Sequence, residues 1–560
     1  MRLVPLGDAA LLAELGGQPD DKVAAAVRRL AGGLLAAPLR GVEAIVPAFT
    51  TVAVHYVPVE IPGAGDPAAT VASWIGRVWA KGGSSAALKP KDVVLPVVYG
   101  GDHGPDLEEV AKACGLTPAE VIRRHARSSY EVRAVGFSPG FPYLAGLPPA
   151  LRVPRRATPR TKVPAGSVAI GGAQTGVYPS ATPGGWNLIG RTPRVLFDPS
   201  VASPSLLRPG DRVKFAVVTE EDYARQAAAV RPPAMPAAQT HDPTFTVLRP
   251  GVLTTVQDLG RTGFQDVGVS PGGAIDSRAL QVANLLVGNL GGEAGLECTL
   301  RGPLLAVRKD AWIAITGARV AGLPWARPFR VKAGEEISLE TIEHGCRAYV
   351  AVAGGVDVPA MLGSRSTLLA AGLGGFEGRA LKAGDRIGTR ADAAHAKVSP
   401  GWFAAPSLAP VPTEDVTVRV VRGPQAEWFS PAAWQTFLGT PYRVNPKSDR
   451  MGARLDGAAL TLLSARELVS EAVATGSVQV PPDGQPIVLL AERQTIGGYP
   501  KIANVITVDL GRMAQARPGS VVRFAEVTID EARRLLGAAG RDLAWFRLGI
   551  GQKEREHGAR

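Results

Sequence analysis

Short runs of alternating hydrophobic and polar residues recur along much of the chain, and this period of two is typical of β-strands. Runs rich in β-branched residues at positions 49–57 and 93–99 predict strands. Apolar residues with helical spacing occur at 20–35, 106–114 and 118–127 and predict helices. The chain ends in a charged segment, which predicts a last helix with a frayed tail. The pattern as a whole predicts a mainly β protein with some α-helix.

A proline- and glycine-rich segment spans residues 136–193 and carries several aromatic residues. Proline denies the backbone a regular helix, whereas glycine permits turns that other residues could not adopt. Long loops in compact domains often carry function. We therefore predict that this segment shapes a functional surface, although the structural loops of a β-domain would have a similar composition.

Four landmarks appear twice in the same order: Gly-Ser-Val, Gln-Thr, a glycine pair followed by an aromatic residue, and Arg-Pro-Gly. Repetition of this kind indicates duplicated structural units. We predict two copies of one β-rich unit, the alternative being a chance match in a chain rich in glycine and proline. The first set lies at residues 166–168, 174–175, 184–186 and 208–210, and the second at 476–478, 494–495, 497–499 and 517–519.

The length of 560 residues predicts roughly three or four domains. Cys114, Cys298 and Cys346 are scattered and odd in number, so they predict neither a disulfide framework nor a zinc site, and they suit a reducing compartment. Asp8 and Glu14 interrupt what would be the apolar part of a signal peptide, and no run approaches the length of a membrane span. We predict a cytoplasmic protein.

The formal net charge of +12 is spread along the chain among acidic residues, without a basic block or a nucleic-acid-binding motif. We therefore predict neither a nucleic-acid partner nor a membrane partner. One local concentration remains in the proline-rich segment, where guanidinium groups on a rigid loop would suit carboxylate or phosphate recognition. A simple surface patch is the alternative. Its members are Arg152, Arg155, Arg156, Arg160 and Lys162.

Long motifs in both halves resemble one known family. The first half contains GFSPGFPYL, PRTKVPAGSV, QTGVYP and PGGWNLIGRTP, and it resembles the B subunit of prokaryotic 5-oxoprolinase, or allophanate hydrolase subunit 1. The second half contains TTVQDLGRTGFQ, SDRMGARL, SEAVATGSVQVPPDGQPI and QTIGGYPKIANV, and it resembles the C subunit of that enzyme, or allophanate hydrolase subunit 2. The same pair forms the carboxyltransferase region of urea carboxylase and urea amidolyase. The resemblance implies cyclophilin-like β-barrel domains, which agrees with the repeat.

The resemblance, together with the glycine- and proline-rich stretches that mark boundaries along the chain, predicts six segments. They are an N-terminal α/β domain at 1–85, a cyclophilin-like domain at 86–226, a linker at 227–243, the first part of the second half at 244–410, a second cyclophilin-like domain at 411–530, and a C-terminal helix and tail at 531–560.

Three functions are compatible with the family. The first is ATP-dependent opening of 5-oxo-L-proline to L-glutamate together with a separate 5-oxoprolinase A subunit, with ATP and Mg²⁺ bound in the complex. The second is a biotin-dependent carboxyltransferase module acting on urea or a related amide, but the sequence contains no biotin carboxylase, biotinyl-lysine motif, amidase serine block or P-loop. The third is a non-catalytic regulator of a sensor histidine kinase. A homo-oligomer is possible under each of them.

The candidate catalytic residues are His125, Arg160 and Lys162. The two cations would stabilise developing negative charge, and His125 would act as a base, unless it only caps a helix end. A hydrogen-bonding loop near residue 497 would suit a planar amide, and the mixed charges near residues 258 and 450 could equally be internal ion pairs. The candidate substrate-binding residues are Phe137, Phe141, Gln174, Thr175, Tyr178, Trp186, Asp258, Arg261, Asp449, Arg450, Arg454, Glu471, Gln479, Gln494, Gly497, Gly498 and Tyr499.

Overall fold

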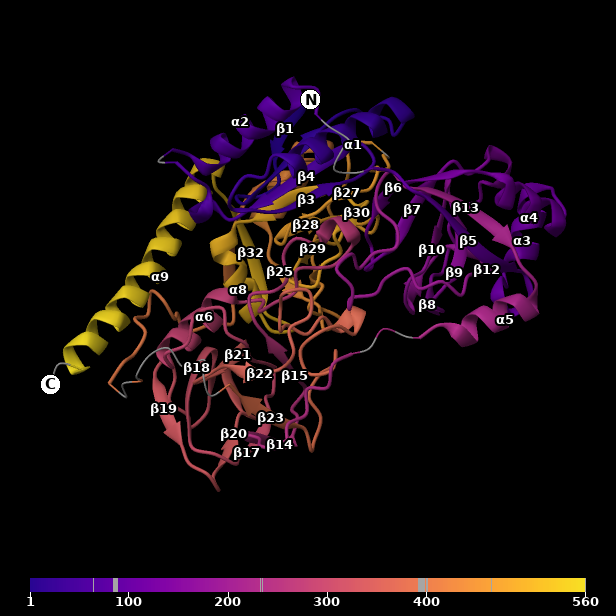
Figure 1. Ribbon diagram of the computed structural model, residues 1–560. Helices are drawn as coiled ribbons and strands as arrows, with labels where there is room; N and C mark the ends of the chain where they lie inside the picture. The colour runs from indigo at the N-terminus through magenta and orange to yellow at the C-terminus, as the bar shows by residue number, and fades with distance from the viewer. Residues whose placement is uncertain are drawn as a thin grey trace.

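The computed structural model describes residues 1–63, 65–83, 89–231, 233, 235–390, 398, 401–464 and 466–558 (Figure 1). The glycine- and serine-rich stretch at 81–87 predicts a hinge, and its residues 84–87 lie outside the described residues, as do two positions of the predicted linker at 227–243. Throughout the part that the structure describes, every helix is too short or too polar to cross a membrane.

The N-terminal domain is a four-stranded antiparallel sheet with strand order β1-β2-β4-β3 and two helices. Both helices begin where an aspartate accepts hydrogen bonds from backbone N–H groups, Asp20 for α1 and Asp66 for α2. Their apolar faces pack on the sheet and form a core of their own. The elements are β1 (Arg2–Pro5), β2 (Ala10–Glu14), α1 (Asp21–Ala36), β3 (Val42–Pro47), β4 (Thr51–Tyr56) and α2 (Pro67–Ala80).

The first barrel is closed by seven strands in the order β10-β7-β6-β13-β5-β12-β9, and β8 and β11 form a separate ribbon. The predicted helices at 106–114 and 118–127 are confirmed as α3 and α4. The elements are β5 (Asp92–Tyr99), α3 (Leu107–Cys114), α4 (Pro118–Arg127), β6 (Tyr130–Val135), β7 (Pro142–Ala145), β8 (Arg160–Val163), β9 (Ser167–Gly171), β10 (Gln174–Val177), β11 (Thr182–Gly184), β12 (Asn187–Arg191), β13 (Arg212–Val217) and α5 (Glu220–Ala229).

The first part of the second half contains two five-stranded sheets around a shared core, with orders β20-β17-β14-β23-β22 and β15-β16-β21-β18-β19. The elements are β14 (Phe245–Arg249), β15 (Leu253–Gln257), α6 (Ser277–Leu286), β16 (Gly295–Thr299), β17 (Leu304–Val307), β18 (Ala311–Val320), β19 (Pro328–Val331), β20 (Glu336–Ser338), β21 (Ile342–Val352), β22 (Val356–Asp357) and β23 (Arg386–Thr389).

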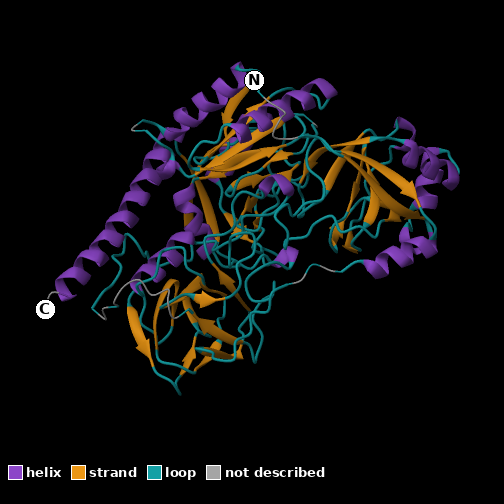
Figure 2. Ribbon diagram, in the orientation of Figure 1, coloured by secondary structure: helices purple, strands orange, loops and turns teal. Residues whose placement is uncertain are grey.

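The second barrel is also closed by seven strands, in the order β24-β31-β28-β29-β26-β25-β32, with β27 and β30 as its ribbon. A long helix, α9, follows it and runs along one side of the molecule (Figure 2). The elements are β24 (Val416–Arg422), α7 (Pro431–Gly439), β25 (Tyr442–Val444), β26 (Gly452–Asp456), β27 (Glu471–Ala472), β28 (Ser477–Gln479), β29 (Ile487–Leu489), β30 (Ile496–Gly497), β31 (Lys501–Val505), α8 (Leu510–Gln515), β32 (Val521–Glu526) and α9 (Ile529–Gly558).

Short 3-10 helices connect these elements. They are η1 (Pro58–Glu60), η2 (Gly101–His103), η3 (Pro149–Leu151), η4 (Gln265–Val267), η5 (Leu369–Ala371), η6 (Ala426–Trp428) and η7 (Thr507–Asp509).

The two barrels have the same topology, so the predicted duplication is confirmed. In each barrel the first and last strands pair in parallel, β5 with β13 and β24 with β32, and all other neighbouring strands are antiparallel. The Gly-Ser-Val, glycine-pair and Arg-Pro-Gly landmarks precede or begin equivalent strands.

The match between the two Gln-Thr pairs is wrong. Gln174 and Thr175 begin β10, whereas Gln494 and Thr495 lie just before β30, which corresponds to β11. The position equivalent to Thr495 is therefore Thr182. A dipeptide of common polar residues matched by chance beside three landmarks that are truly equivalent.

A single apolar core joins the N-terminal domain to both barrels. Side chains from the N-terminal sheet and from the face of the first barrel pack together with Ala472, Ala474 and Ile496 of the second barrel. Figure 1 shows the N-terminal domain lying over β27 and β30, with the first barrel to one side. We call this region the three-way junction.

We expect Gly136→Ala to destabilise the protein by about 1–3 kcal/mol through overpacking. A Cβ atom at position 136 would lie 2.9 Å from the side chain of Ile496. Gly439→Ala is the control, because a Cβ atom there has no neighbour within 4 Å. Denaturant unfolding of both variants tests the junction, and equal stabilities would contradict it.

Candidate functional site

A strained turn places the aromatic residues of the proline-rich segment at the three-way junction. The backbone N–H of Ser138 donates to the carbonyl of Gly136 at 2.8 Å across Phe137, which has a φ of 67°. A three-residue turn with positive φ at its centre is rare, and strain of this kind concentrates at functional sites. The ring of Phe137 meets Phe141 and Tyr178 edge-on, with centroids 5.4 and 6.4 Å apart.

The structure thus brings four predicted aromatic residues together. Phe141 continues the cluster to Trp186, at a centroid distance of 5.6 Å. Phe137 is half-buried, whereas the other three are buried. The cluster therefore presents one partly exposed ring beside the junction.

The glycine loop of the second barrel gathers the predicted amide side chains. A Cβ atom at Gly497 would lie 2.6 Å from Nε2 of Gln494 and 2.7 Å from Nε2 of Gln479, so a larger residue there would displace both amide groups. Gly498 and Tyr499 are exposed beside them. Amide donors and acceptors at this loop can match the two edges of a planar amide.

Glu471, on the strand that pairs with this loop, holds a buried ion pair. Its Oε1 accepts from Nζ of Lys501 at 2.6 Å and from Nε2 of Gln425 at 2.8 Å. Lys501 is completely buried. Glu471 is therefore a fixed, hydrogen-bonded carboxylate rather than a freely exposed one.

Arg160 occupies the corresponding place in the first barrel. Its two terminal nitrogens donate to both oxygens of Asp106, at 2.9 and 2.7 Å, and Arg156 donates to the same carboxylate at 2.9 Å. Arg160 pairs with Gly184 in the first ribbon, just as Glu471 pairs with Gly497 in the second. Lys162, two residues further along β8, is exposed.

His125 lies inside the first barrel and not at the junction. Its Nδ1 is 2.8 Å from the hydroxyl of Tyr99, and its Nε2 is 2.9 Å from Oγ1 of Thr175. The side chain is completely buried, and burial lowers its pKa to about 3. The structure brings His125 together with Thr175 but does not bring it to Arg160, because α4 directs its last turn into the barrel core.

The second barrel shows what this position does. His125 stacks on Phe215 at 4.6 Å, and Phe437 stacks on Phe524 at 4.3 Å, both at 24°. His125 lies five residues before the buried Tyr130 and contacts it, and Phe437 lies five residues before the buried Tyr442 and contacts it. A phenylalanine thus fills the place of His125 in the duplicate, which favours a packing role over that of a general base.

The loop with Asp258 and Arg261 is fixed by hydrogen bonds within the second half. Asp258 accepts from the backbone of Gly260 at 2.7 Å and from the hydroxyl of Ser364 at 2.7 Å. Arg261 donates to the carbonyl of Ser366, and burial lowers its pKa. Both side chains therefore stabilise the loop from inside the protein. They do so by hydrogen bonds to neighbouring residues, and the described structure has no ion pair between Asp258 and Arg261.

Arg450 joins two domains by a buried ionic network. It donates to Glu297 of β16 and, at 2.6 Å, to Glu492 of the second barrel. Burial alone would lower the pKa of Arg450, but these two carboxylates raise it above its usual value. Asp449 and Arg454 are exposed and stand apart from the network: Asp449 accepts from the backbone of Met451 at 2.8 Å and so shapes a turn.

Three charged or polar residues escaped the sequence prediction. Arg493 and His55 are buried at the junction, and Lys501 is the partner of Glu471. Arg493 directly precedes Gln494, so its position next to the glycine loop was the available signal. His55 gave none, because it comes from a strand of another domain.

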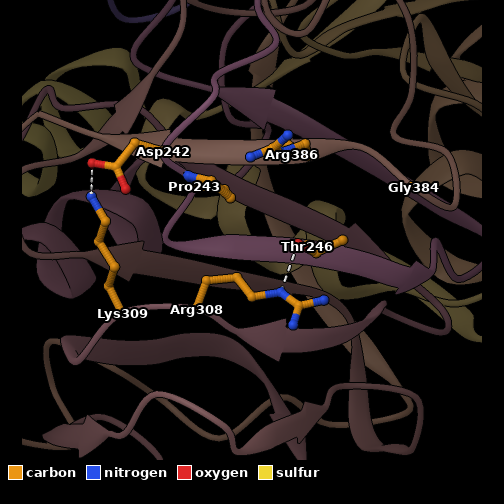
Figure 3. Close-up of a pocket in the computed structure, with 7 residues that line it drawn as sticks. All are labelled: Asp242, Pro243, Thr246, Arg308, Lys309, Gly384 and Arg386. Carbon is orange, nitrogen blue, oxygen red and sulfur yellow. Dashed lines mark hydrogen bonds and ion pairs between the residues drawn. The ribbon is translucent and has the colours of Figure 1, made fainter.

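A separate basic pocket lies on the sheet of β14, β17 and β23, where no predicted site residue lines it (Figure 3). It has a volume of about 450 Å³. Lys309 pairs with Asp242, and Nε of Arg308 donates to Oγ1 of Thr246 at 3.0 Å. Arg386 adds a third cation. In the described ranges, no group of histidine, cysteine and carboxylate side chains could hold a metal ion.

Comparison with known proteins identifies both halves. The family "Carboxyltransferase domain, subdomain C and D" matches residues 1–207, and "Carboxyltransferase domain, subdomain A and B" matches residues 267–526. The 5-oxoprolinase C subunit of Escherichia coli is 39% identical over 299 residues, which cover 51% of this chain and 92% of the relative. The 5-oxoprolinase B subunit of Bacillus subtilis is 42% identical over 223 residues, which cover 39% of this chain and 93% of the relative.

A solved structure shares the fused organisation. The crystal structure of TTHA0988 superposes on the chain with a TM-score of 0.80 at 34% identity. The match covers 92% of this chain and 99% of the solved chain.

We expect His125→Phe to lower the free energy of unfolding. Turnover, measured after the chain is combined with the 5-oxoprolinase A subunit that the resemblance implies, should stay close to that of the wild type. The hydroxyl of Tyr99 loses its His125 partner, at a cost of about 1–3 kcal/mol, whereas the hydroxyl of Thr175 keeps its hydrogen bond to the carbonyl of Ala169. Thermal melts and rate measurements on the same preparations test this. A ~10²- to 10⁴-fold slower rate without loss of stability would instead identify His125 as a base.

Proposed function

We propose that the chain is the fused B and C component of an ATP-dependent 5-oxoprolinase, because it belongs to the family of the 5-oxoprolinase B and C subunits. The reaction opens 5-oxo-L-proline to L-glutamate, and the enzyme also needs a separate A subunit. The observation that carries the proposal is coverage: the chain spans 92% of one C-type relative and 93% of one B-type relative. Because the three cysteines are free, as is usual in a reducing compartment, we propose that the reaction takes place in the cytoplasm.

The three-way junction supports a single functional unit. The core that joins the halves includes Ile496 from the second half and Phe141 from the first. Because burial of apolar surface is favourable, this shared core holds the two halves together permanently. It disfavours the reading in which one half antagonises the other as a regulator of a histidine kinase.

The exposed edge of the junction suits a small cyclic amide. Phe137 offers a partly exposed ring, and Gln494 offers both a donor and an acceptor from the glycine loop. We propose that the lactam ring lies between these two side chains. Orientation by such contacts is one of the largest contributions that a binding surface makes to catalysis.

ATP and magnesium do not fit the described residues of this chain. The sequence has no P-loop, and no group of side chains in the described ranges could hold a metal ion. When bound, ATP supplies a phosphoryl group that activates an amide oxygen. We therefore assign nucleotide binding to the A subunit or to its interface with this chain, and we derive no step through ATP.

A biotin-dependent carboxyltransferase is the second candidate. The names of both matching families favour it, and the glycine loop would accept a ureido ring as readily as a lactam. Carboxyl transfer to urea or a related amide would then need a separate biotinylated partner. Turnover that depends on added biotin carboxylase, and not on the A subunit, would favour this candidate.

We expect the purified chain to form little glutamate from 5-oxoproline and ATP, and we expect an added A subunit to restore the reaction. The reason is that the sequence has no P-loop and that no group of side chains in the described ranges could hold the metal ion that accompanies ATP. Glutamate release, with and without the partner, tests this. Full activity from the chain alone would mean that it holds a complete catalytic centre.

We propose that Arg160 stabilises negative charge, and we expect Arg160→Ala to slow turnover by about a hundredfold or more. Arg160→Lys should recover only part of the rate, because an ammonium group cannot replace the two-pronged contact. Arg156→Ala is the matched control, since Arg156 binds the same Asp106 through one nitrogen. Equal rate losses in both variants, or a fall in stability alone, would leave Arg160 with a structural role.

A further inference from the structure

Arg493 is a buried cation with neutral partners. The residue is only 2% exposed. It donates to Oγ1 of Thr475 at 3.1 Å, to the carbonyl of Gln494 at 3.2 Å and to Oε1 of Gln265 at 2.9 Å. In the described part of the chain, no carboxylate lies within 4 Å of it.

This situation differs from that of two other buried cations, Arg450 and Lys501. Arg450 has two carboxylate partners, and Lys501 has one. A buried charge without a counter-ion is costly, and proteins normally pair it. Burial lowers the pKa of Arg493 only to about 10, so the guanidinium stays charged at neutral pH. Its charge is left for something outside the described chain to balance.

The guanidinium also has unused donors. It carries five N–H groups, and its three partners take one each. Two N–H groups therefore remain, one on each terminal nitrogen. A carboxylate has two oxygens that can accept from two guanidinium N–H groups in a bidentate contact.

Unpartnered polar atoms of other side chains gather at the same junction. The Nε2 of His55, Oγ1 of Thr495 and Oγ of Ser138 are buried and have no hydrogen-bond partner in the described structure. His55 feels the charge of Arg493, which together with burial lowers its pKa to about 3. Thr495 is two residues from Arg493 along the chain.

Ser138 reaches the same place from the first barrel. A Cβ atom at Gly268 would lie 2.5 Å from the carbonyl of Ser138, and Gly140 donates to the carbonyl of Val267 at 2.9 Å. Gln265, a partner of Arg493, begins the 3-10 helix that ends at Val267. With His55 and Thr495, four domains thus contribute polar groups to one region around Arg493.

We propose that Arg493, assisted by His55 and the hydroxyls of Ser138 and Thr495, binds the carboxylate of the small substrate. This inference rests on the proposed function, in which 5-oxoproline carries a carboxylate next to its lactam ring. Phe137 precedes Ser138 and Gln494 follows Arg493 along the chain, and both are half-buried, whereas Ser138 and Arg493 are buried. In the proposed site the lactam ring lies against the two half-buried side chains and its carboxylate reaches the buried pair. Phosphate presents similar oxygens, and the test separates the two.

Titration calorimetry on the full chain tests the proposal with three probes: 5-oxoproline, the neutral lactam 2-pyrrolidinone, and inorganic phosphate. We expect 5-oxoproline to bind and 2-pyrrolidinone to bind at least about tenfold more weakly. Phosphate should not compete with 5-oxoproline. Competition by phosphate, or equal affinity for the two lactams, would overturn the carboxylate assignment.

Two variants locate the contact. Arg493→Met should weaken 5-oxoproline binding by about ten- to a hundredfold and leave 2-pyrrolidinone binding unchanged. Arg308→Met is the matched control, because Nε of Arg308 also donates to a threonine hydroxyl, but in the basic pocket of Figure 3. It should keep wild-type affinity, and a loss there would move the site to that pocket.

Thr495→Val tests the same site independently, in case the Arg493→Met variant does not fold. Valine keeps the shape of threonine and removes a buried hydroxyl that has no partner in the described structure. The free variant should therefore be at least as stable as the wild type, while its affinity for 5-oxoproline falls severalfold. Unchanged affinity in a stable variant would remove Thr495 from the site.

Turnover separates this inference from the proposed function. If the reconstituted enzyme forms glutamate and Arg493→Met keeps the wild-type KM, the carboxylate site is wrong and the function stands. If reconstitution yields no glutamate but 5-oxoproline binding still requires Arg493, the site stands and the proposed reaction fails.

Discussion

The contact between the turn at residues 136–138 and Ile496 is the constraint on which the rest of the molecule depends. Gly136 has no room for a side chain against Ile496, and Gly268 has none against the carbonyl of Ser138. These backbone-close contacts hold the first barrel, the N-terminal sheet and the second barrel around one apolar core. Because the core needs all three, neither half can keep the shape of the junction without the other.

The duplicated barrels separate what the fold needs from what a particular site needs. Tyr130 and Tyr442 contact equivalent phenylalanines, so the packing of both barrels is the same. The polar positions differ: Asp106 with Arg160 in one barrel is replaced by Gln425 with Glu471 in the other. One framework therefore presents a cationic ribbon in the first half and an anionic one in the second.

Local signals in the sequence were sufficient for the elements and for the duplication, but not for the partners of buried polar residues. The spacing of apolar residues located the helix ending at Arg127, and three landmarks located equivalent strands. The same spacing could not reveal that His125 turns into the barrel, because its partners Tyr99 and Thr175 come from distant strands. His55 and Arg493 meet only because two domains pack together, and no period within either segment encodes that meeting.

Buried charge has two opposite uses in this structure. The network of Glu297, Arg450 and Glu492 has opposite charges within hydrogen-bonding distance, so it fixes the second barrel against the neighbouring sheet and leaves little for a ligand to add. Arg493, at the same depth, has only neutral partners among the described residues. A charge that the chain does not balance raises the free energy of the empty protein, and an anion that balances it recovers that free energy on binding. The junction is therefore where a bound carboxylate would gain most from the fold itself.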